Sequence, residues 1–264
     1  FAGTRYKSDD FSPYIYKTED YGKSWKRITN GINNLHFTRA MRADRIKPGL
    51  LYAGTEFGMY ISYDDGASWK SFQLNLPVVP ITDLTIKNND LIVATQGRSF
   101  YILDDLTVVQ QKKADMLNKA LHVFNVNPAY RMPAGGRRGG GGGFTGASFA
   151  NVGMNPSNGV VFNYYLKDVT DSTRLSIMLM DRNRKTIKTY STSSKENKVD
   201  ITKGMNQFEW DMNYPEAERV EGLILWNGFI RGPKAAPGNY FAKFRSGTDS
   251  AEVSFTILAD PNYK

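Results

Sequence analysis

Apolar and polar residues alternate along short runs in the second half of the chain. The first two runs cover residues 160–166 and 175–179, where every second side chain is apolar. A period of two predicts strands buried on one face. Further runs of this kind cover residues 207–211, 222–226, 239–244 and 252–257. About seven short strands in roughly a hundred residues indicate an immunoglobulin- or fibronectin-like β-sandwich over residues 148–258, followed by a tail at 259–264.

In the first part of the chain, strand-like runs recur together with a short polar pattern, Ser/Thr-x-Asp-x-Gly-x-x-Trp. One copy has Thr18, Asp20, Gly22 and Trp25, and the next has Ser62, Asp64, Gly66 and Trp69, with the two aspartates 44 positions apart. A third, weaker copy retains Asp104 but lacks the Gly and the Trp. A period of about 40 to 45 residues with several short strands is that of a four-stranded propeller blade.

Each polar pattern predicts a tight turn between two strands. Hydroxyl and carboxylate oxygens accept hydrogen bonds from backbone N–H groups in the turn, the Gly supplies a positive φ, and the Trp returns to the apolar layer between sheets. The pattern resembles the Asp-box, or bacterial neuraminidase repeat, of sialidases and sortilins. That resemblance implies a structural turn away from the ligand-binding face.

The whole chain is therefore expected to be all-β, with a partial propeller followed by a sandwich. Residues 1–110 hold the last two to three blades, 111–133 connect the domains, and 134–147 form a glycine-rich linker or loop. A propeller ring normally has at least four blades. We therefore expect the remaining blades to come from sequence that precedes residue 1.

The resemblance extends beyond the Asp-box pattern. Four segments are similar to the C-terminal part of large exported bacterial proteins of the sortilin-like or glycosyl-hydrolase-like type: 51–62, 74–77, 94–100 and 204–211. It implies an exported protein of the periplasm or cell surface of a Gram-negative bacterium, with other envelope proteins as partners and a carbohydrate or peptide as ligand. One departure is Gln96, since the family pattern has His at this position.

Composition narrows the possible chemistry. The 264 residues include no Cys and two His, which excludes disulfides and thiolate sites and leaves little imidazole chemistry. The net charge of +8 would suit nucleic acid, but the basic residues are dispersed and no basic helix or RNA-reading motif accompanies them, so no nucleic-acid partner is expected. No run of about 18 apolar residues occurs, so no transmembrane segment is expected.

Two charged residues are candidates to face a ligand. Glu56 and Arg98 each follow the end of an inner strand, where propellers place groups that line the central channel. The alternative is a Glu–Arg bridge or loop hydrogen bonds that tie neighbouring blades together. Arg39, Arg42 and Arg45 recur at three-residue steps and are expected to be solvated.

Several aromatic and acidic residues have both a functional and a structural interpretation. Trp210 and Trp226 either stack on sugars or belong to the core, and alternation with Phe208 and Met212 favours the core for Trp210. The pairs Asp9-Asp10, Asp64-Asp65 and Asp104-Asp105 either bind a metal or hold turns. The spacing of a calcium loop is missing, which favours turns.

The sequence therefore assigns no catalytic residue, no metal and no cofactor. The first hypothesis is a non-catalytic binding or assembly component of a bacterial envelope or surface complex. The alternative is the C-terminal portion of a sialidase-like glycoside hydrolase whose catalytic residues lie in further blades upstream. A nucleic-acid binder is the third hypothesis, and it predicts an affinity that falls steeply with salt.

Overall fold

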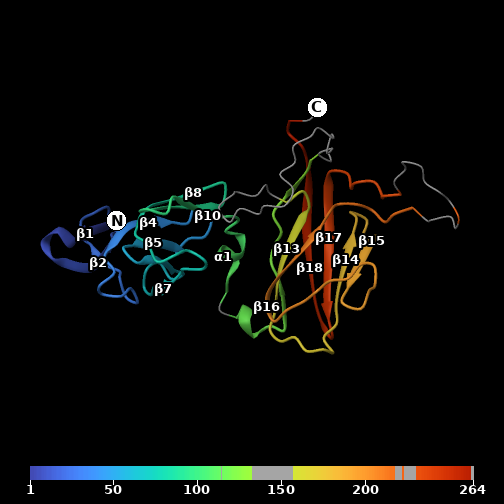
Figure 1. The fold of residues 1–264 in the computed structure, drawn as a ribbon, viewed down its shortest axis with the longest axis horizontal. Coiled ribbons are helices and arrows are strands. Elements are labelled where there is room, and N and C mark those ends of the chain that lie inside the picture. The colour runs from blue at the N-terminus through green and yellow to red at the C-terminus, as the bar shows by residue number, and fades with distance from the viewer. Residues whose placement is uncertain (114, 133–156, 218–221, 223–229, 263–264) are drawn as a thin grey trace. The chain divides into compact units, whose positions relative to one another are not determined.

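The computed structural model describes residues 1–113, 115–132, 157–217, 222 and 230–262. It divides into two compact units, unit 1 (residues 1–110) and unit 2 (residues 111–264), and the predicted all-β class is confirmed (Figure 1). Within the described ranges, the helical segments are short. The glycine-rich segment 134–147 and Trp226 lie outside the described residues.

Unit 1 contains three antiparallel sheets, and each strand pairs with its neighbour in sequence. The first sheet holds β1 (Ala2–Arg5), β2 (Asp10–Lys17) and β3 (Lys26–Arg27), with the 3-10 turn η1 (Tyr6–Ser8) between β1 and β2. The second sheet holds β4 (Thr38–Ala43), β5 (Leu51–Thr55), β6 (Gly58–Ser62) and β7 (Lys70–Ser71). The third sheet holds β8 (Ile81–Lys87), β9 (Asp90–Thr95) and β10 (Phe100–Leu103), and helix α1 (Thr107–Gln111) follows it.

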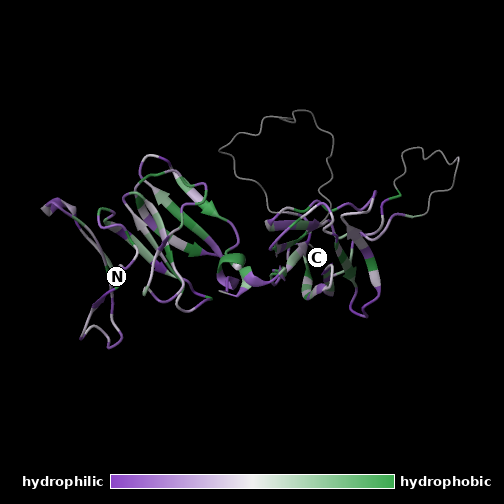
Figure 2. Ribbon diagram, turned by 90° about the horizontal axis from the view of Figure 1, so that it is seen from below, coloured by the Kyte–Doolittle hydropathy of each residue, from purple (hydrophilic) through white to green (hydrophobic). Residues whose placement is uncertain are grey.

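The second sheet of unit 1 is buried on both faces. Ala53 and Trp69 belong to an apolar cluster shared with the first sheet, whereas Tyr52, Met59 and Ile61 belong to a cluster shared with the third sheet. In Figure 2 the hydrophobic stretches of this unit lie along the strands and the loops are mostly hydrophilic. The three sheets are therefore stacked, with the second sheet in the middle.

The described residues of unit 2 form two sheets that bury one apolar cluster between them. The smaller sheet has the order β11 (Leu121–Val123), β13 (Val160–Leu166) and β16 (Gly204–Trp210). The larger sheet has the order β12 (Ala129–Arg131), β18 (Asp249–Ala259), β17 (Gly238–Ser246), β14 (Leu175–Met180) and β15 (Thr186–Ser191). Another 3-10 turn, η2 (Met116–Asn118), precedes β11.

The tryptophan predicted to lie in the core of unit 2 is fully buried there. Trp210 packs edge-on against Tyr240 and Phe255, and its indole Nε1 donates a hydrogen bond of 3.2 Å to the backbone carbonyl of Asn213. Met212 belongs to the same cluster. The core interpretation of Trp210 is confirmed, and this side chain is not available to stack on a sugar.

Residues 111–133, expected to connect the two domains, belong to unit 2. Within this segment β11 pairs with β13, and β12 pairs in parallel with β18, so the segment supplies one strand to each sheet of unit 2. Both strands are three residues long and lie at sheet edges. Edge strands of this length contribute backbone hydrogen bonds with few buried side chains, so their apolar pattern is weak.

Candidate functional site

Residues 18–25, here called the first turn, connect β2 to β3. The Thr18 hydroxyl oxygen accepts a hydrogen bond from the Gly22 N–H at 2.7 Å. The Asp20 carboxylate accepts hydrogen bonds from the Ser24 N–H at 2.8 Å and from the Ser24 hydroxyl at 2.6 Å. These contacts, the Ser24 hydroxyl first, lower the pKa of Asp20 to about 2. The Asp20 carboxylate is therefore engaged by the turn itself.

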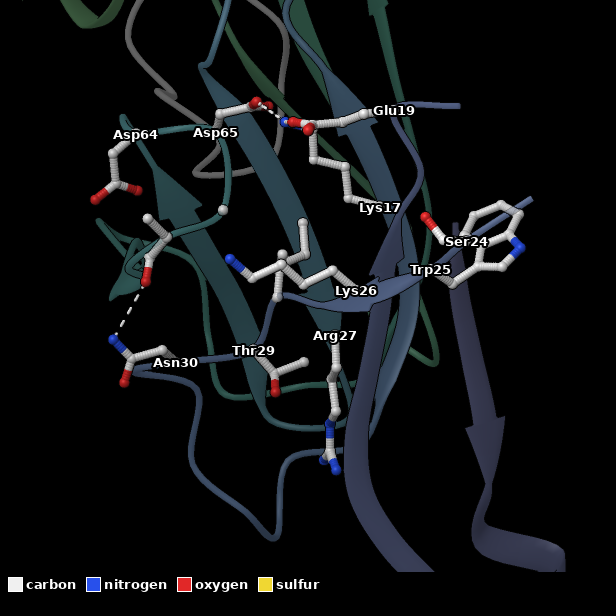
Figure 3. Close-up of a pocket in the computed structure, with 13 residues that line it drawn as sticks. Lys17, Glu19, Ser24, Trp25, Lys26, Arg27, Thr29, Asn30, Asp64 and Asp65 are labelled. Carbon is white, nitrogen blue, oxygen red and sulfur yellow. Dashed lines mark hydrogen bonds and ion pairs between the residues drawn. The ribbon is translucent and has the colours of Figure 1, made fainter. Parts of the chain in front are cut away.

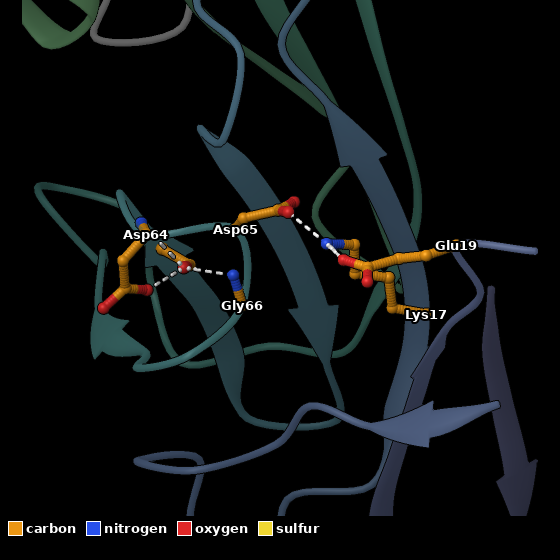
Figure 4. Close-up of polar contacts among 6 residues, drawn as sticks. Lys17, Glu19, Asp64, Asp65 and Gly66 are labelled. Carbon is orange, nitrogen blue, oxygen red and sulfur yellow. Dashed lines mark hydrogen bonds and ion pairs between the residues drawn. The ribbon is translucent and has the colours of Figure 1, made fainter.

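Residues 62–69, here called the second turn, connect β6 to β7 through the same set of contacts, and Figure 4 shows the part of this turn around Asp64 and Gly66. The Ser62 hydroxyl oxygen accepts from the Gly66 N–H at 2.9 Å, and Asp64 accepts from the Ser68 N–H at 2.8 Å and from the Ser68 hydroxyl at 2.5 Å. The side-chain hydroxyl of Ser68 is the main cause of a lowered pKa of Asp64. The same residue pattern thus forms the same turn twice.

The tryptophans that end the two turns have different surroundings. Trp69 is 3% exposed and its indole Nε1 donates a hydrogen bond of 2.8 Å to the backbone carbonyl of Ile28 in the first sheet. Trp25 is 49% exposed and contacts the ring of Phe1 edge-on at 5.1 Å. The difference follows the stack, because the first sheet covers Trp69 and no sheet within the described residues covers Trp25.

The third copy of the pattern does not form such a turn. Asp104 is exposed and makes no hydrogen bond with any described residue. Its neighbour Asp105 has a φ of 54° and accepts hydrogen bonds from the Thr107 N–H at 3.0 Å and the Asn89 side chain at 3.2 Å. Asp105 therefore holds the start of α1. A structural turn role for Asp104 is incorrect, because no Gly follows to supply the second positive φ.

The first and second turns line a cleft of about 490 Å³ between the first two sheets (Figure 3). Lys17 forms an ion pair with the nearby Glu19 and, across the cleft, a second one with Asp65. Asn30 donates a hydrogen bond of 3.2 Å to the backbone carbonyl of Ala67, also across the cleft. These contacts occupy polar groups of the cleft and join the sheets. The cleft therefore lies at the contact between the first and second sheets.

Glu56 and Arg98 lie at the opposite end of the strands from the first and second turns. The Glu56 carboxylate pairs with Arg39, whose Nε donates a hydrogen bond of 2.6 Å, and both side chains are half-buried. Arg98 is exposed and makes no ion pair with a described residue. The two predicted ligand-facing residues are not paired with each other. Gln96 is exposed in the same loop as Arg98, and its N–H donates to the backbone carbonyl of Pro80 at 2.9 Å.

The expectation that Arg39, Arg42 and Arg45 are solvated is wrong for Arg39, which is half-buried. Arg39 sits at a β-bulge at the start of β4, where the pairing with β5 skips one residue, and it pairs with Glu56. Arg42 is exposed and pairs with Asp83 at 2.7 Å on the surface, and Arg45 is exposed as well. A bulge re-aims a side chain relative to plain strand alternation, so the periodic pattern gave the wrong environment for Arg39.

A hollow of about 480 Å³ lies at this end of unit 1, lined by η1, its flanking residues and two β-bulges. The bulges contribute Arg39 from β4 and Thr82 from β8, at equivalent places in the second and third sheets. The lining is completed by Thr4, Arg5, Tyr6, Lys7 and Ser8. All three charged residues of this lining are basic. We call it the basic hollow.

The sequence interpretation missed most of the basic hollow. Lys7 and Arg5 occur in a stretch without apolar periodicity, and Arg5 is 3.8 Å from Asp10, which lies outside the lining. The repeat could have predicted that Arg39 and Thr82 lie close together, because they are separated by one blade-length period. Equivalent positions in successive repeats lie at the same end of the stack.

The paired aspartates make contacts with protein donors. Asp10 accepts from the Ser12 N–H at 3.0 Å and from the Tyr14 hydroxyl at 2.5 Å, and the latter contact is the main cause of its lowered pKa. Asp65 pairs with Lys17. In the described part of the chain, no three His, Cys, Asp or Glu residues gather as metal ligands would. Asp10 is therefore engaged by residues of its own strand, and Asp65 by an ion pair with Lys17.

A buried carboxylate that the sequence did not single out is Asp44, in the loop between β4 and β5. It accepts hydrogen bonds from the N–H groups of Ile46 and Lys47 at 2.8 Å, from the Tyr52 hydroxyl at 3.3 Å and from the Gln110 amide at 3.0 Å. Burial and the nearby Asp44 charge raise the pKa of Tyr52. Asp44 therefore fastens α1 to the second sheet and is structural.

Comparisons with known proteins give little. No family model and no curated protein match the chain. One solved structure that it resembles is the extracellular domain of a hybrid two-component system from B. thetaiotaomicron, at a TM-score of 0.29 and 9% identity. The alignment covers 94% of this chain and 29% of that one. A TM-score this low assigns no fold.

Among the described residues, none of the helices has the length and apolar character needed to span a bilayer.

Proposed function

We propose that the chain is a non-catalytic binding or assembly component of a bacterial envelope or surface complex. In this proposal unit 1 is the last two to three blades of an Asp-box propeller, and unit 2 is an immunoglobulin-like sandwich. Stacked antiparallel sheets whose strands follow one another in sequence support the first part, since this is how propeller blades are built. Two sheets around one core support the second. Export of the protein rests on the resemblance noted in the sequence.

The basic hollow carries the proposal of ligand binding. Its charged lining residues are Arg5, Lys7 and Arg39, and its other lining residues offer hydroxyl groups. Guanidinium and ammonium groups bind carboxylates by charge-assisted hydrogen bonds, and hydroxyls suit hydrophilic ligands. We therefore assign to the hollow an acidic, hydrophilic ligand, either a carbohydrate or a peptide.

Arg39 has the geometry of an oriented anion-binding group. Its Nε is held by Glu56 at 2.6 Å, and its guanidinium carbon lies 5.2 Å from the ring centroid of Phe37 and 5.8 Å from that of Tyr6. Neither Nη nitrogen hydrogen-bonds to a described residue, so the Nη–H donors are free for a ligand. An arginine already fixed in place loses less side-chain entropy on binding.

Calorimetric titration of the full chain with acidic oligosaccharides, acidic peptides and their neutral counterparts tests the proposal. We expect one acidic class to bind and Arg39→Gln to weaken its affinity at least about tenfold, the scale of one charged hydrogen bond. Arg42→Gln is the matched control, since Arg42 lies on the same strand and pairs with a carboxylate but does not line the hollow. Equal binding of neutral ligands, or equal loss in both variants, would contradict the proposal.

The alternative of a glycoside hydrolase is tested on the same protein. Unit 1 as proposed contains too few blades to collect the carboxylates and the arginine cluster that sialidase-type hydrolysis draws from around a ring. We expect no hydrolysis of sialosides or aryl glycosides by this chain. Turnover that disappears with Glu56→Gln would make the chain an enzyme and would overturn the non-catalytic proposal.

A further inference from the structure

The charged residues that line the basic hollow differ in how far their charges are compensated. Arg39 pairs with Glu56, and Arg5 lies 3.8 Å from Asp10. Neither carboxylate belongs to the lining, but each offsets the charge of its arginine at a distance. Lys7 forms no ion pair with a described residue. The attraction that the hollow exerts on an approaching anion therefore comes from Lys7.

The backbone of Lys7 is held in place by its neighbours. Lys7 is the middle residue of η1, and the Asp9 N–H closes this turn by donating to the backbone carbonyl of Tyr6 at 3.1 Å. The Tyr6 ring stacks on buried Phe37 with their centroids 4.9 Å apart. The Asp9 carboxylate is exposed, lies outside the lining and forms no ion pair with a described residue. An anchored turn thus keeps an uncompensated ammonium group at the hollow.

Arg39 contributes direction rather than net charge. Its Nε is bound to the Glu56 carboxylate at 2.6 Å, so the two charges largely cancel beyond the pair itself. The free Nη–H donors of Arg39 still form hydrogen bonds with an acidic group that comes within contact distance. Arg39 therefore orients a ligand that Lys7 has attracted.

Thr82 adds a second directional requirement. Its hydroxyl donates a hydrogen bond of 3.2 Å to the backbone carbonyl of Ala94, so its oxygen is left to accept. Thr82 and Arg39 occupy equivalent bulges in neighbouring sheets, and both line the hollow. An acidic group suits Arg39, whereas a ligand hydroxyl or N–H suits the Thr82 oxygen. The lining thus offers a position for an acidic group and another for a hydrogen-bond donor.

We infer that Lys7 selects the ligand by charge, and that the hollow takes a ligand with one acidic group bordered by hydroxyl or N–H donors. This inference rests on the proposed binding function of the hollow. The three basic residues of the lining and the two adjoining carboxylates leave one net positive charge, which one acidic group neutralises. A second acidic group would meet no further uncompensated cation in the described lining, so it should add little affinity.

Amide NMR titration of the full chain with matched probes tests the number of charges. The sugar acids are glucuronate, with one carboxylate, and glucarate, with two. The peptides are acetyl-Ser-Asp-Ser-amide and acetyl-Asp-Ser-Asp-amide. In the class that binds, we expect the second carboxylate to lower the dissociation constant less than about threefold. For the probe with one carboxylate, the dissociation constant should rise about threefold between about 20 mM and about 200 mM NaCl.

Variants separate the role of Lys7 from that of Arg39. Lys7→Gln should weaken binding of the probe with one carboxylate about fivefold at low salt and abolish most of the salt dependence, and Lys7→Arg should restore both. Arg39→Lys keeps the charge balance with Glu56 but loses the guanidinium fork. It should therefore weaken binding by the same factor at both salt concentrations.

Lys23→Gln is the matched control for Lys7→Gln. Lys23 is exposed in the first turn, forms no ion pair with a described residue and lies outside the lining, so its substitution removes the same charge elsewhere. Both glutamine variants should keep the wild-type melting temperature, and Lys23→Gln should keep the wild-type affinity.

The outcomes distinguish this inference from the proposed function. A gain above about threefold from the second carboxylate would overturn the inference and leave binding of acidic ligands by the hollow intact. Equal losses in Lys7→Gln and Lys23→Gln, or an unchanged salt dependence in Lys7→Gln, would have the same meaning. If none of the acidic probes binds, the proposed ligand-binding function fails and the inference fails with it.

Discussion

The first and second turns of unit 1 have the same pattern and the same hydrogen bonds, yet their tryptophans differ in burial. Trp69 is 3% exposed and Trp25 is 49% exposed. In both turns a hydroxyl and a carboxylate satisfy the same N–H groups, at distances that agree within a few tenths of an ångström. The local pattern therefore determines the turn, and the neighbouring sheet determines what the tryptophan contributes.

This comparison separates local from tertiary stabilisation. A turn closed by its own side chains needs no partner beyond eight residues of sequence. An indole ring stabilises the fold by burial only when a second surface covers it. The free energy gained is then larger than that from any one hydrogen bond of the turn. Substitutions at equivalent positions of the two turns should therefore change the free energy of unfolding by similar amounts for polar residues and by different amounts for the tryptophans and glycines.

The largest difference is expected for the tryptophans. Trp69→Ala should lower the free energy of unfolding of unit 1 by about 3 to 5 kcal/mol, since it removes a buried aromatic side chain and leaves the Ile28 carbonyl without its donor. Trp25→Ala should cost less than about 1 kcal/mol in the monomer. Urea unfolding at low protein concentration, followed by amide NMR signals of unit 1, measures both. Equal losses would show that another surface covers Trp25.

Glycine substitutions should give the next largest difference. Both Gly22 and Gly66 have φ near +90°, so an alanine at either position costs about 1 to 2 kcal/mol in strain. At Gly66 a Cβ atom would also lie 2.4 Å from Ile28 Cδ1, whereas at Gly22 its nearest neighbour is 3.7 Å away. Gly66→Ala should therefore destabilise unit 1 by about 1 to 3 kcal/mol more.

A double-variant cycle checks the cause of that glycine difference. Ile28→Val removes the Cδ1 atom that the new Cβ would meet, so it should recover part of the loss in Gly66→Ala and none of the loss in Gly22→Ala. Additive effects in both turns would mean that the overlap at Gly66 relaxes without cost.

The carboxylates should behave alike in the two turns. Asp64→Ala removes the acceptor for the Ser68 N–H and hydroxyl, and we expect a loss of about 1 kcal/mol, because these groups are partly exposed and water replaces the bond. Asp20→Ala should shift stability in the same direction. Ligand affinity should stay unchanged in both, since the turns lie at the far end of the strands from the basic hollow. Thermal melting and calorimetry measure the two quantities.

The smallest effect is the pH dependence of the first turn. The Ser24 contacts lower the pKa of Asp20 from 3.8 to about 2. A carboxyl with a depressed folded-state pKa adds stability that is present above the unfolded value and is lost as pH falls through the folded one. Stability should therefore decline between about pH 4 and pH 2. In carboxyl-carbon NMR titrations, Ser24→Ala should raise the pKa of Asp20, whereas Ser68→Ala should raise that of Asp64 only.

The parts of the fold that follow from local chemistry could be predicted from the sequence. Alternation placed Trp210 in a core, and the side chains at residues 18–25 and 62–69 make the hydrogen bonds that their types and spacing imply. The third copy failed where one local requirement was missing, because without a Gly the chain after Asp104 continues into α1. The local pattern therefore predicts the turn only when all of its residues are present.

The parts that depend on distant segments could not be predicted. The partner of Glu56 is Arg39 rather than Arg98, because a β-bulge turns Arg39 out of the alternation on which a sequence pattern relies. The pairing of residues 121–131 with the two sheets of unit 2 was not predicted, because the partner strands are formed by residues far along the chain. Neither outcome is encoded within a window of a few residues.

The parallel pairing of β12 with β18 has a consequence for synthesis of the chain. Each sheet of unit 1 joins strands that are consecutive in sequence, so it can form as soon as its own strands have emerged. β12 joins a strand at residues 249–259, so the larger sheet of unit 2 cannot be completed until that strand has been made. Until then residues 129–131 lack their partner strand, and an unpaired strand edge in a growing chain is open to aggregation or to protection by a chaperone.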